Sequence, residues 1–140
     1  MKKYIILIPV YNDRESLAQL IENINFELKD LNLEVSIIVI NDASSEQITD
    51  NYPNTENIIS IEIINMKENK GHTRCIASGL KYIYEKKEFD YVMPMDGDGE
   101  DRPEELRLLI EKIKTICDWI CVLFLSFTSS LCICIKFKGR

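Results

Sequence analysis

Short runs of consecutive apolar residues, each followed by polar residues, constrain the fold of this chain more than any other feature. A strand that is covered on both faces of a sheet reads as such a run, rather than as an alternation of apolar and polar residues. Four runs predict four strands, at residues 4–10, 35–40, 58–64 and 89–95. Glu62 in the third run predicts that this strand lies nearer the sheet edge.

Between these runs, apolar residues recur every three or four positions, which is the spacing of an amphipathic helix. The first such stripe runs from Leu17 to Leu31, and Asn12 is predicted to cap this helix. A short helical turn, capped by Ser44, is predicted before Pro53.

Two further helices are predicted in the second half of the chain. One covers residues 75–83 and follows a turn at Gly71, with Ala77 and Gly79 small enough to lie close to a strand or ligand. The other follows Asp101 as its cap and tolerates Pro103 in its first turn. Its buried stripe is predicted at Leu106, Leu109, Ile110, Ile113 and Ile116.

This alternation of strands and helices predicts an α/β fold, with a mostly parallel sheet flanked by helices. In such sheets, ligands bind outside the carboxyl ends of the strands. Polar segments at residues 11–13, 41–45 and 96–101 all follow predicted strands, so they are expected to converge on one edge. Neither G-x-G-x-x-G nor G-x4-G-K-[ST] occurs, which disfavours a dinucleotide-binding Rossmann fingerprint and a P-loop.

The segment after the fourth strand is the most acidic in the chain. Like-charge repulsion makes such a cluster costly, and a divalent cation with oxygen ligands would relieve it. Glycines within the cluster would let the backbone approach a ligand closely. The sequence therefore predicts a metal and phosphate site at the C-terminal end of the fourth strand, in the segment where Asp96, Asp98, Glu100 and Asp101 are spaced by Gly97 and Gly99.

Three other interpretations of this acidic segment are a solvated turn, an EF-hand loop and a phosphatase nucleophile. A solvated turn is disfavoured because two other polar loops are predicted at the same sheet edge. An EF-hand loop is excluded, since Asp101 stands where glycine is needed and Arg107 stands where glutamate is needed. An Asp-x-Asp nucleophile of the phosphatase type remains open on these residues alone.

Charge and cysteine content exclude some functions. The net charge is −6 and every acidic residue lies at or before Asp118, which argues against a nucleic-acid partner. The five cysteines are an odd number, they have no recognised zinc spacing, and no secretory leader precedes them. They are therefore predicted to be reduced thiols of a cytoplasmic protein.

Four motifs in order resemble the family 2 glycosyltransferases, nearest the dolichol-phosphate-sugar synthase type, over residues 3–116. The motifs are Pro9-Val-Tyr-Asn12, Ile40-Asn-Asp-Ala-Ser-Ser45, Asn69-Lys-Gly71 with Ala77 and Gly79, and Met95-Asp-Gly-Asp98 with Pro103-Glu104. The resemblance implies a GT-A fold, a nucleotide-diphosphate-sugar donor and an Mg²⁺ or Mn²⁺ ion. It disfavours the phosphatase interpretation, whose nucleophile usually sits on the first strand.

Site residues follow from the resemblance by position. The implied donor-binding residues are Pro9 and Tyr11 at the base, Asn12, Asp42 as acceptor of a hydrogen bond from the base, Arg74, and Asp96 facing the ribose or metal. The implied metal ligands are Asp96 and Asp98. The family's acceptor-binding half, which supplies the catalytic base, has no counterpart in the sequence.

Purely structural roles compete with several of these assignments. The Tyr11 ring could simply pack over the sheet edge, and Asp42 could be a turn former with no further role. His72, the single histidine, is interpreted as a surface residue at a helix start rather than a base, because no partner is visible. Glu100 and Asp101 are interpreted as loop and cap residues.

Residues 1–117 are thus predicted to form a nucleotide-sugar-binding half-domain, and residues 118–140 an apolar tail foreign to the family pattern. Three interpretations of the tail are a membrane helix at 119–135, a β-hairpin around 128–130, and foreign sequence that results from a reading-frame slip after Ile116. A 17-residue span is shorter than the ~20 residues that cross a bilayer. The frame slip, with strand-like local structure, is favoured.

The predicted function is metal-assisted, inverting transfer of a sugar from a nucleotide-diphosphate donor. The acceptor suggested by the resemblance is a polyprenyl phosphate or another lipid or glycan, with membrane contact through residues 119–135 at the inner face. The alternative is a truncated, non-catalytic nucleotide-binding fragment or interaction module.

Overall fold

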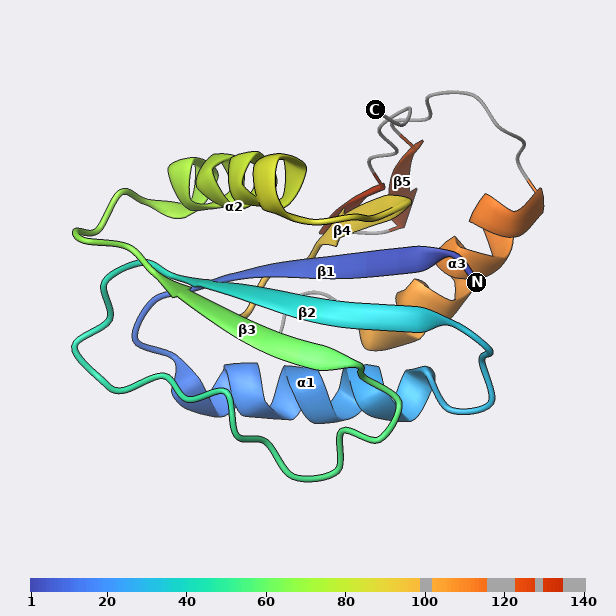
Figure 1. Cartoon of the computed structure of the whole chain (residues 1–140), viewed down its shortest axis with the longest axis horizontal. Coiled ribbons are helices and arrows are strands. Elements are labelled where there is room, and N and C mark those ends of the chain that lie inside the picture. Colours follow the sequence, from blue (N-terminus) through green and yellow to red (C-terminus); the bar gives the residue numbers. More distant parts are fainter. Residues whose placement is uncertain (99–101, 116–122, 128–129, 135–140) are drawn as a thin grey trace.

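A computed structural model describes residues 1–98, 102–115, 123–127 and 130–134. Within these residues, four strands form one sheet in the order β3-β2-β1-β4, and each neighbouring pair is parallel (Figure 1). The strands are β1 (Lys3–Val10), β2 (Glu34–Asn41), β3 (Ser60–Asn65) and β4 (Tyr91–Pro94). The predicted α/β class is confirmed, and the Glu62 strand lies at the sheet edge as expected.

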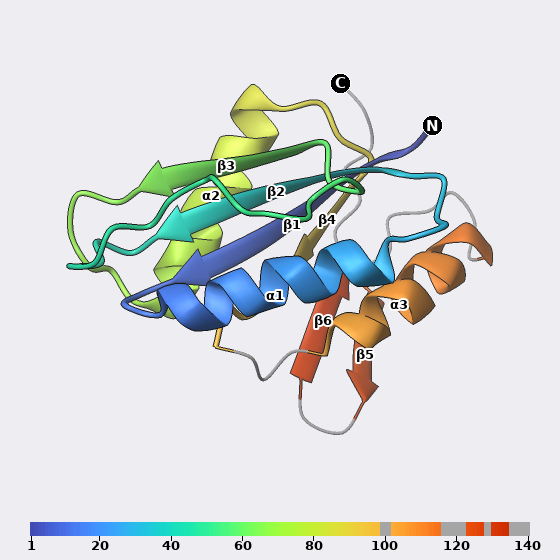
Figure 2. The ribbon, with the colours of Figure 1, turned by 90° about the horizontal axis from the view of Figure 1, so that it is seen from below.

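Helices cover both faces of this sheet. Figures 1 and 2 show α1 (Arg14–Glu27) and α3 (Pro103–Thr115) on one face and α2 (His72–Lys86) on the other. Side chains from alternate positions of β1 and β2 therefore enter two separate cores. One core contains Ile6, Ile8, Leu17, Ile21, Ile37 and Ile110, and the other contains Ile5, Leu7, Ile38, Ile40, Cys75 and Ile83.

The start of α1 corrects one prediction. Asp13, not Asn12, caps the helix, because the Asp13 carboxylate accepts a hydrogen bond from the Ser16 amide at 3.2 Å. Asn12 has a positive φ of 48° and its side chain accepts from the Ser45 amide at 2.8 Å. The predicted stripe also overran the helix, since Leu31 lies beyond its end and still packs against the core.

The predicted helical turn capped by Ser44 is wrong, because residues 42–59 contain no helix. The Ser44 hydroxyl is used in a different way: it accepts a hydrogen bond from the Asn12 amide at 2.9 Å. Together with the bond between Asn12 and Ser45, this contact ties the loop after β1 to the loop after β2.

The glycines around α2 behave largely as predicted. Gly71 makes the turn into the helix with φ 85° and ψ 161°, a conformation that side chains rarely adopt. Gly79 lies against the sheet, where an added Cβ would be 2.5 Å from a Leu7 methyl carbon. Ala77 was wrongly expected on this face; it is exposed.

Helix α3 begins at Pro103, so this proline lies in its first turn as predicted. Its stripe packs into the core at Leu106, Leu109, Ile110 and Ile113. The fourth strand is shorter than expected, since β4 covers only Tyr91–Pro94. The predicted cap Asp101, the loop residues Gly99 and Glu100, and Ile116 lie outside the described residues.

In the tail, β5 (Leu123–Phe127) and β6 (Ser130–Cys134) pair antiparallel, and β6 lies beside β4 (Figure 2). The strand-like structure matches the hairpin interpretation, and a helix over residues 123–127 and 130–134 is wrong. Among the described helices, none has the length and apolar character needed to cross a membrane. That the tail is foreign to the family stays a prediction.

Candidate functional site

A cavity of about 170 Å³ opens at the carboxyl ends of the central strands, beside the start of α2. It draws residues from the loops after β1, β2 and β4. The lining residues are Pro9, Val10, Tyr11, Asp13, Asp42, His72, Cys75, Asp96, Gly97 and Asp98. Three polar loops predicted to meet at one sheet edge therefore do meet there.

Five of the predicted site residues lie together in this cavity: Pro9, Tyr11, Asp42, Asp96 and Asp98. Two do not line it. The Asn12 side chain is bonded to the loop after β2, and Arg74 is exposed in the first turn of α2. Tyr11 is 53% exposed at the cavity, so it does not pack over the sheet edge as a buried ring would.

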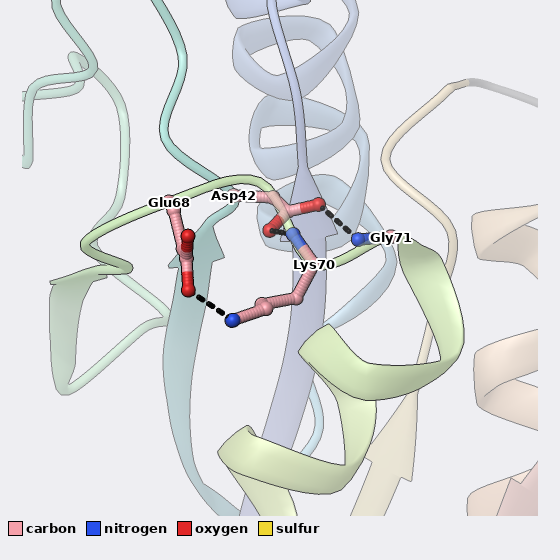
Figure 3. A network of polar contacts seen from close by, with 4 residues as sticks. All are labelled: Asp42, Glu68, Lys70 and Gly71. Atoms are coloured by element: carbon pink, nitrogen blue, oxygen red, sulfur yellow. Dashed lines mark hydrogen bonds and ion pairs between the residues drawn. The ribbon is translucent and has the colours of Figure 1, made fainter.

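Asp42 is nearly fully buried, with 4% of its surface exposed. Its Oδ1 accepts a hydrogen bond from the Lys70 amide at 2.7 Å and its Oδ2 accepts one from the Gly71 amide at 2.9 Å (Figure 3). Both partners lie far along the chain, so Asp42 is not merely a local turn former. Its carboxylate fastens the end of β2 to the segment that starts α2.

The same segment carries an ion pair on its outer side. The Lys70 ammonium contacts the Glu68 carboxylate, and both side chains point away from the Asp42 carboxylate in Figure 3. The amides of Lys70 and Gly71, by contrast, are turned inward to Asp42. The buried Asp42 carboxylate therefore holds the backbone of this turn, while the Lys70 side chain lies at the surface.

His72 is the first residue of α2, and its Nε2 lies 3.1 Å from Oδ1 of Asp96. The side chains are 55% and 39% exposed, respectively. The predicted position at a helix start is right, but the expectation that this histidine lacks a partner is wrong. Nothing in the sequence signalled the contact, because the two residues belong to elements far apart in the chain.

Gly97 separates the two aspartates and packs tightly against the end of β1. A Cβ at this position would lie 2.8 Å from the Pro9 carbonyl oxygen, closer than such atoms normally approach. The absence of a side chain at Gly97 therefore lets the segment carrying Asp96 and Asp98 lie directly on β1. This close approach brings both carboxylates to the cavity.

Asp13 and Cys75 also line the cavity, although neither was predicted as a site residue. Asp13 is recognisable afterwards as the capping residue directly before α1. The Cys75 thiol is buried and its Sγ lies 3.5 Å from the Ile40 carbonyl oxygen. Burial, with a smaller contribution from the Asp42 charge, raises the pKa of Cys75 to about 11, so the thiol is protonated at neutral pH.

The acidic lining bears on metal binding. Within the described parts of the chain, no group of three or more His, Cys, Asp or Glu side chains is arranged to hold an ion. Asp96 and Asp98 provide two carboxylates on the same wall. Mg²⁺ is usually held by one or two carboxylates together with phosphate oxygens, so this donor set fits an ion shared with a phosphate ligand.

Comparison with known proteins identifies the family. The family described as Glycosyl transferase family 2 matches residues 5–129. This chain belongs to that family. The match covers the cavity residues and extends past residue 117, where the sequence pattern was predicted to end.

Two curated relatives of this family member are each 30% identical to it. One is an uncharacterised glycosyltransferase of Synechocystis sp., aligned over 76% of this chain and 33% of the relative. The other is a dolichol-phosphate mannosyltransferase of Pyrococcus furiosus, aligned over 83% of this chain and 31% of the relative. The chain thus spans about a third of the length of these relatives.

Solved structures of S. aureus TarS share the fold of this family member. The structure of TarS 1-349 in complex with UDP matches with a TM-score of 0.61 and 21% identity, over 81% of this chain and 32% of TarS. The complex with UDP-GlcNAc matches with a TM-score of 0.56 and 23% identity, over 81% and 31%. The predicted GT-A type of fold is confirmed.

Proposed function

We propose that the cavity binds the nucleoside diphosphate of a sugar donor and serves sugar transfer from that donor. One observation carries this proposal: Tyr11, Asp42, Asp96 and Asp98, which come from three separate loops, line the same cavity. Membership of glycosyl transferase family 2 supports it. The UDP and UDP-GlcNAc complexes of TarS support a nucleotide-sugar donor of this kind.

The base would lie between Pro9 and Tyr11, whose ring is exposed enough to stack on it. The Asp42 carboxylate already accepts two hydrogen bonds, and a carboxylate has about four acceptor positions, so it can accept another from the base. Asn12 would act by holding the loop after β1 in place. Arg74, exposed in the first turn of α2, would reach over the nucleotide.

Asp96 and Asp98 would hold an Mg²⁺ or Mn²⁺ ion, which fits because both are oxygen donors on one cavity wall. When bound, such an ion neutralises charge that develops on the departing diphosphate. The two carboxylates would also orient the donor, because their negative charge repels its phosphates from positions where the ion does not lie between them. Asp96 lies deeper than Asp98, so it would face the ribose as well as the ion.

The acceptor is proposed to be a lipid phosphate, with inversion at the transferred sugar carbon. Support comes from the relative named dolichol-phosphate mannosyltransferase. The phosphate oxygen of such an acceptor would attack the sugar as the bond to the nucleoside diphosphate breaks. A membrane surface would then present the acceptor, with residues 119–135 as the proposed contact.

Isothermal titration calorimetry tests donor binding. UDP and GDP would be titrated into the chain with Mn²⁺ and, separately, with EDTA. We expect binding that is stronger with Mn²⁺ than with EDTA, and this gain is lost in Asp98→Ala. Asp50→Ala is a matched control, since Asp50 is exposed on the 42–59 segment and does not line the cavity. Absence of metal-dependent affinity for any nucleoside diphosphate would contradict the proposal.

A second candidate function is nucleotide binding without transfer. The observation that favours it concerns the lining carboxylates among the described residues: Asp13 caps α1, Asp42 holds the turn before α2, and the remaining two are the proposed metal ligands. With these roles taken, none of these four carboxylates is left to deprotonate a hydroxyl acceptor. Incubation with radiolabelled sugar donor and polyprenyl phosphate separates the two functions, because labelled lipid requires transfer.

A further inference from the structure

The contact between His72 and Asp96 joins two walls of the cavity. His72 begins α2, whereas Asp96 follows β4, and the Nε2 to Oδ1 distance of 3.1 Å is a hydrogen-bonding distance. Both side chains also line the cavity itself. The imidazole thus touches a carboxylate that the proposed function assigns to the donor and its ion.

Hydrogen bonds to Asp42 fix the backbone directly before His72. Gly71, directly before it, donates its amide to the buried Asp42 carboxylate at 2.9 Å, and Lys70 does the same at 2.7 Å. Gly71 also has a φ of 85°, which fixes the direction in which α2 leaves the turn. His72 therefore projects from a backbone position that two long-range hydrogen bonds define.

Asp96 needs such a partner. It lies two residues from Asp98, and two carboxylates on one wall repel each other when both are ionised. A nitrogen donor at Oδ1 lowers that cost and favours one orientation of the Asp96 side chain. Carboxylates that bind metal ions are themselves commonly held by hydrogen bonds of this kind.

We infer that His72 is a positioning residue, which orients the Asp96 carboxylate for the ion that accompanies the nucleoside diphosphate. This inference rests on the proposed function, because it concerns the same cavity. In this arrangement Asp42 fixes the backbone of the turn at residues 70–72. The His72 side chain, which starts from this fixed backbone, then orients the Asp96 carboxylate. This role requires no contact between His72 and the base or the transferred sugar.

Three variants test the inference. His72→Ala removes the donor, and His72→Gln places an amide nitrogen near the position of Nε2. Thr73→Ala is the matched control, since Thr73 is the exposed neighbour in the same helical turn and does not line the cavity. For each, calorimetry measures the affinity for UDP and GDP with Mn²⁺ and with EDTA, and thermal unfolding checks the fold.

We expect His72→Ala to weaken Mn²⁺-dependent nucleotide affinity by roughly tenfold or more, as for other partners of metal-binding carboxylates. Affinity in EDTA should be unchanged, His72→Gln should recover most of the loss, and Thr73→Ala should match the unaltered chain. An unaltered metal dependence in His72→Ala would overturn the inference alone. Equal losses in His72→Ala and His72→Gln, or a parallel loss in EDTA, would also overturn it. If the unaltered chain binds no nucleoside diphosphate, the proposed function fails and this inference fails with it.

Discussion

Oδ2 of Asp42 and the amide nitrogen of Gly71 lie 2.9 Å apart, which joins the end of β2 to the start of α2. The Asp42 amide in turn donates to the Val10 carbonyl at 2.8 Å, at the end of β1. Asp42 therefore connects three of the elements that surround the cavity. The shape of the cavity depends on this buried carboxylate before any ligand is present.

Asp42→Asn should destabilise the chain. The amide keeps the size of the side chain but points an NH₂ group at one of two backbone amides, so a buried acceptor is lost. We expect a decrease of roughly 1–3 kcal/mol in the free energy of unfolding. Urea denaturation measures it, with Asp50→Asn as an exposed control. A stability equal to that of the control would show that the two hydrogen bonds do not hold the turn.

Gly71→Ala should destabilise the chain without any steric clash. Nothing lies within 4 Å of the position where a Cβ would stand, so the effect comes from the backbone alone. With φ 85° and ψ 161°, Gly71 occupies a region that is almost restricted to glycine, and forcing alanine into it costs about 1–3 kcal/mol. Urea denaturation measures the change, and a neutral or stabilising result would contradict this conformation.

The sequence was sufficient for the fold and for the convergence of the site, for a clear physical reason. Consecutive apolar residues specify a buried strand, and parallel strands place their carboxyl ends together, so Tyr11, Asp42 and Asp98 could be predicted to meet. The partnership of His72 with Asp96 could not, because it depends on where α2 begins and on side-chain orientations. No short-range pattern encodes either.

The two wrong helix-capping predictions have a common cause. Asn12 and Ser44 both carry side chains that cap helices in local sequence terms, yet both are used in bonds between the loops after β1 and β2. Local propensity and long-range bonding compete for the same polar atoms. Here the long-range bonds prevail, because they hold together the two loops at the edge of the cavity.

Gly97→Ala should lower the Mn²⁺-dependent affinity for nucleotide strongly and the free energy of unfolding only moderately. The added Cβ would lie 2.8 Å from the Pro9 carbonyl oxygen, and because this atom belongs to the backbone of β1 the segment carrying Asp96 and Asp98 must move away. We expect a stability loss of about 1–3 kcal/mol, as for other overpacked positions. Calorimetry with Mn²⁺ should show nucleotide affinity reduced toward that of Asp98→Ala. Unchanged affinity would mean that the close approach to β1 does not position the carboxylates.

Cys75 should resist alkylation in the folded chain. Burial raises its pKa from 9.0 to about 11, so at pH 8 its thiolate fraction is about 100-fold smaller than that of an unshifted thiol. We expect iodoacetamide to modify Cys75 at least ~100-fold more slowly than in the urea-unfolded chain. Mass spectrometry of the Cys75 peptide follows this residue separately from the other four cysteines.

The same pKa predicts a pH effect on stability. Because the folded state disfavours the Cys75 thiolate, the protonated thiol contributes stability that is fully present below pH 9.0 and is lost as the pH rises to about 11. Cys75→Ala removes this contribution, so its unfolding free energy should converge on that of the unaltered chain across that interval. A constant difference between the two chains from pH 8 to 11 would show that the buried thiol does not titrate as the fold requires.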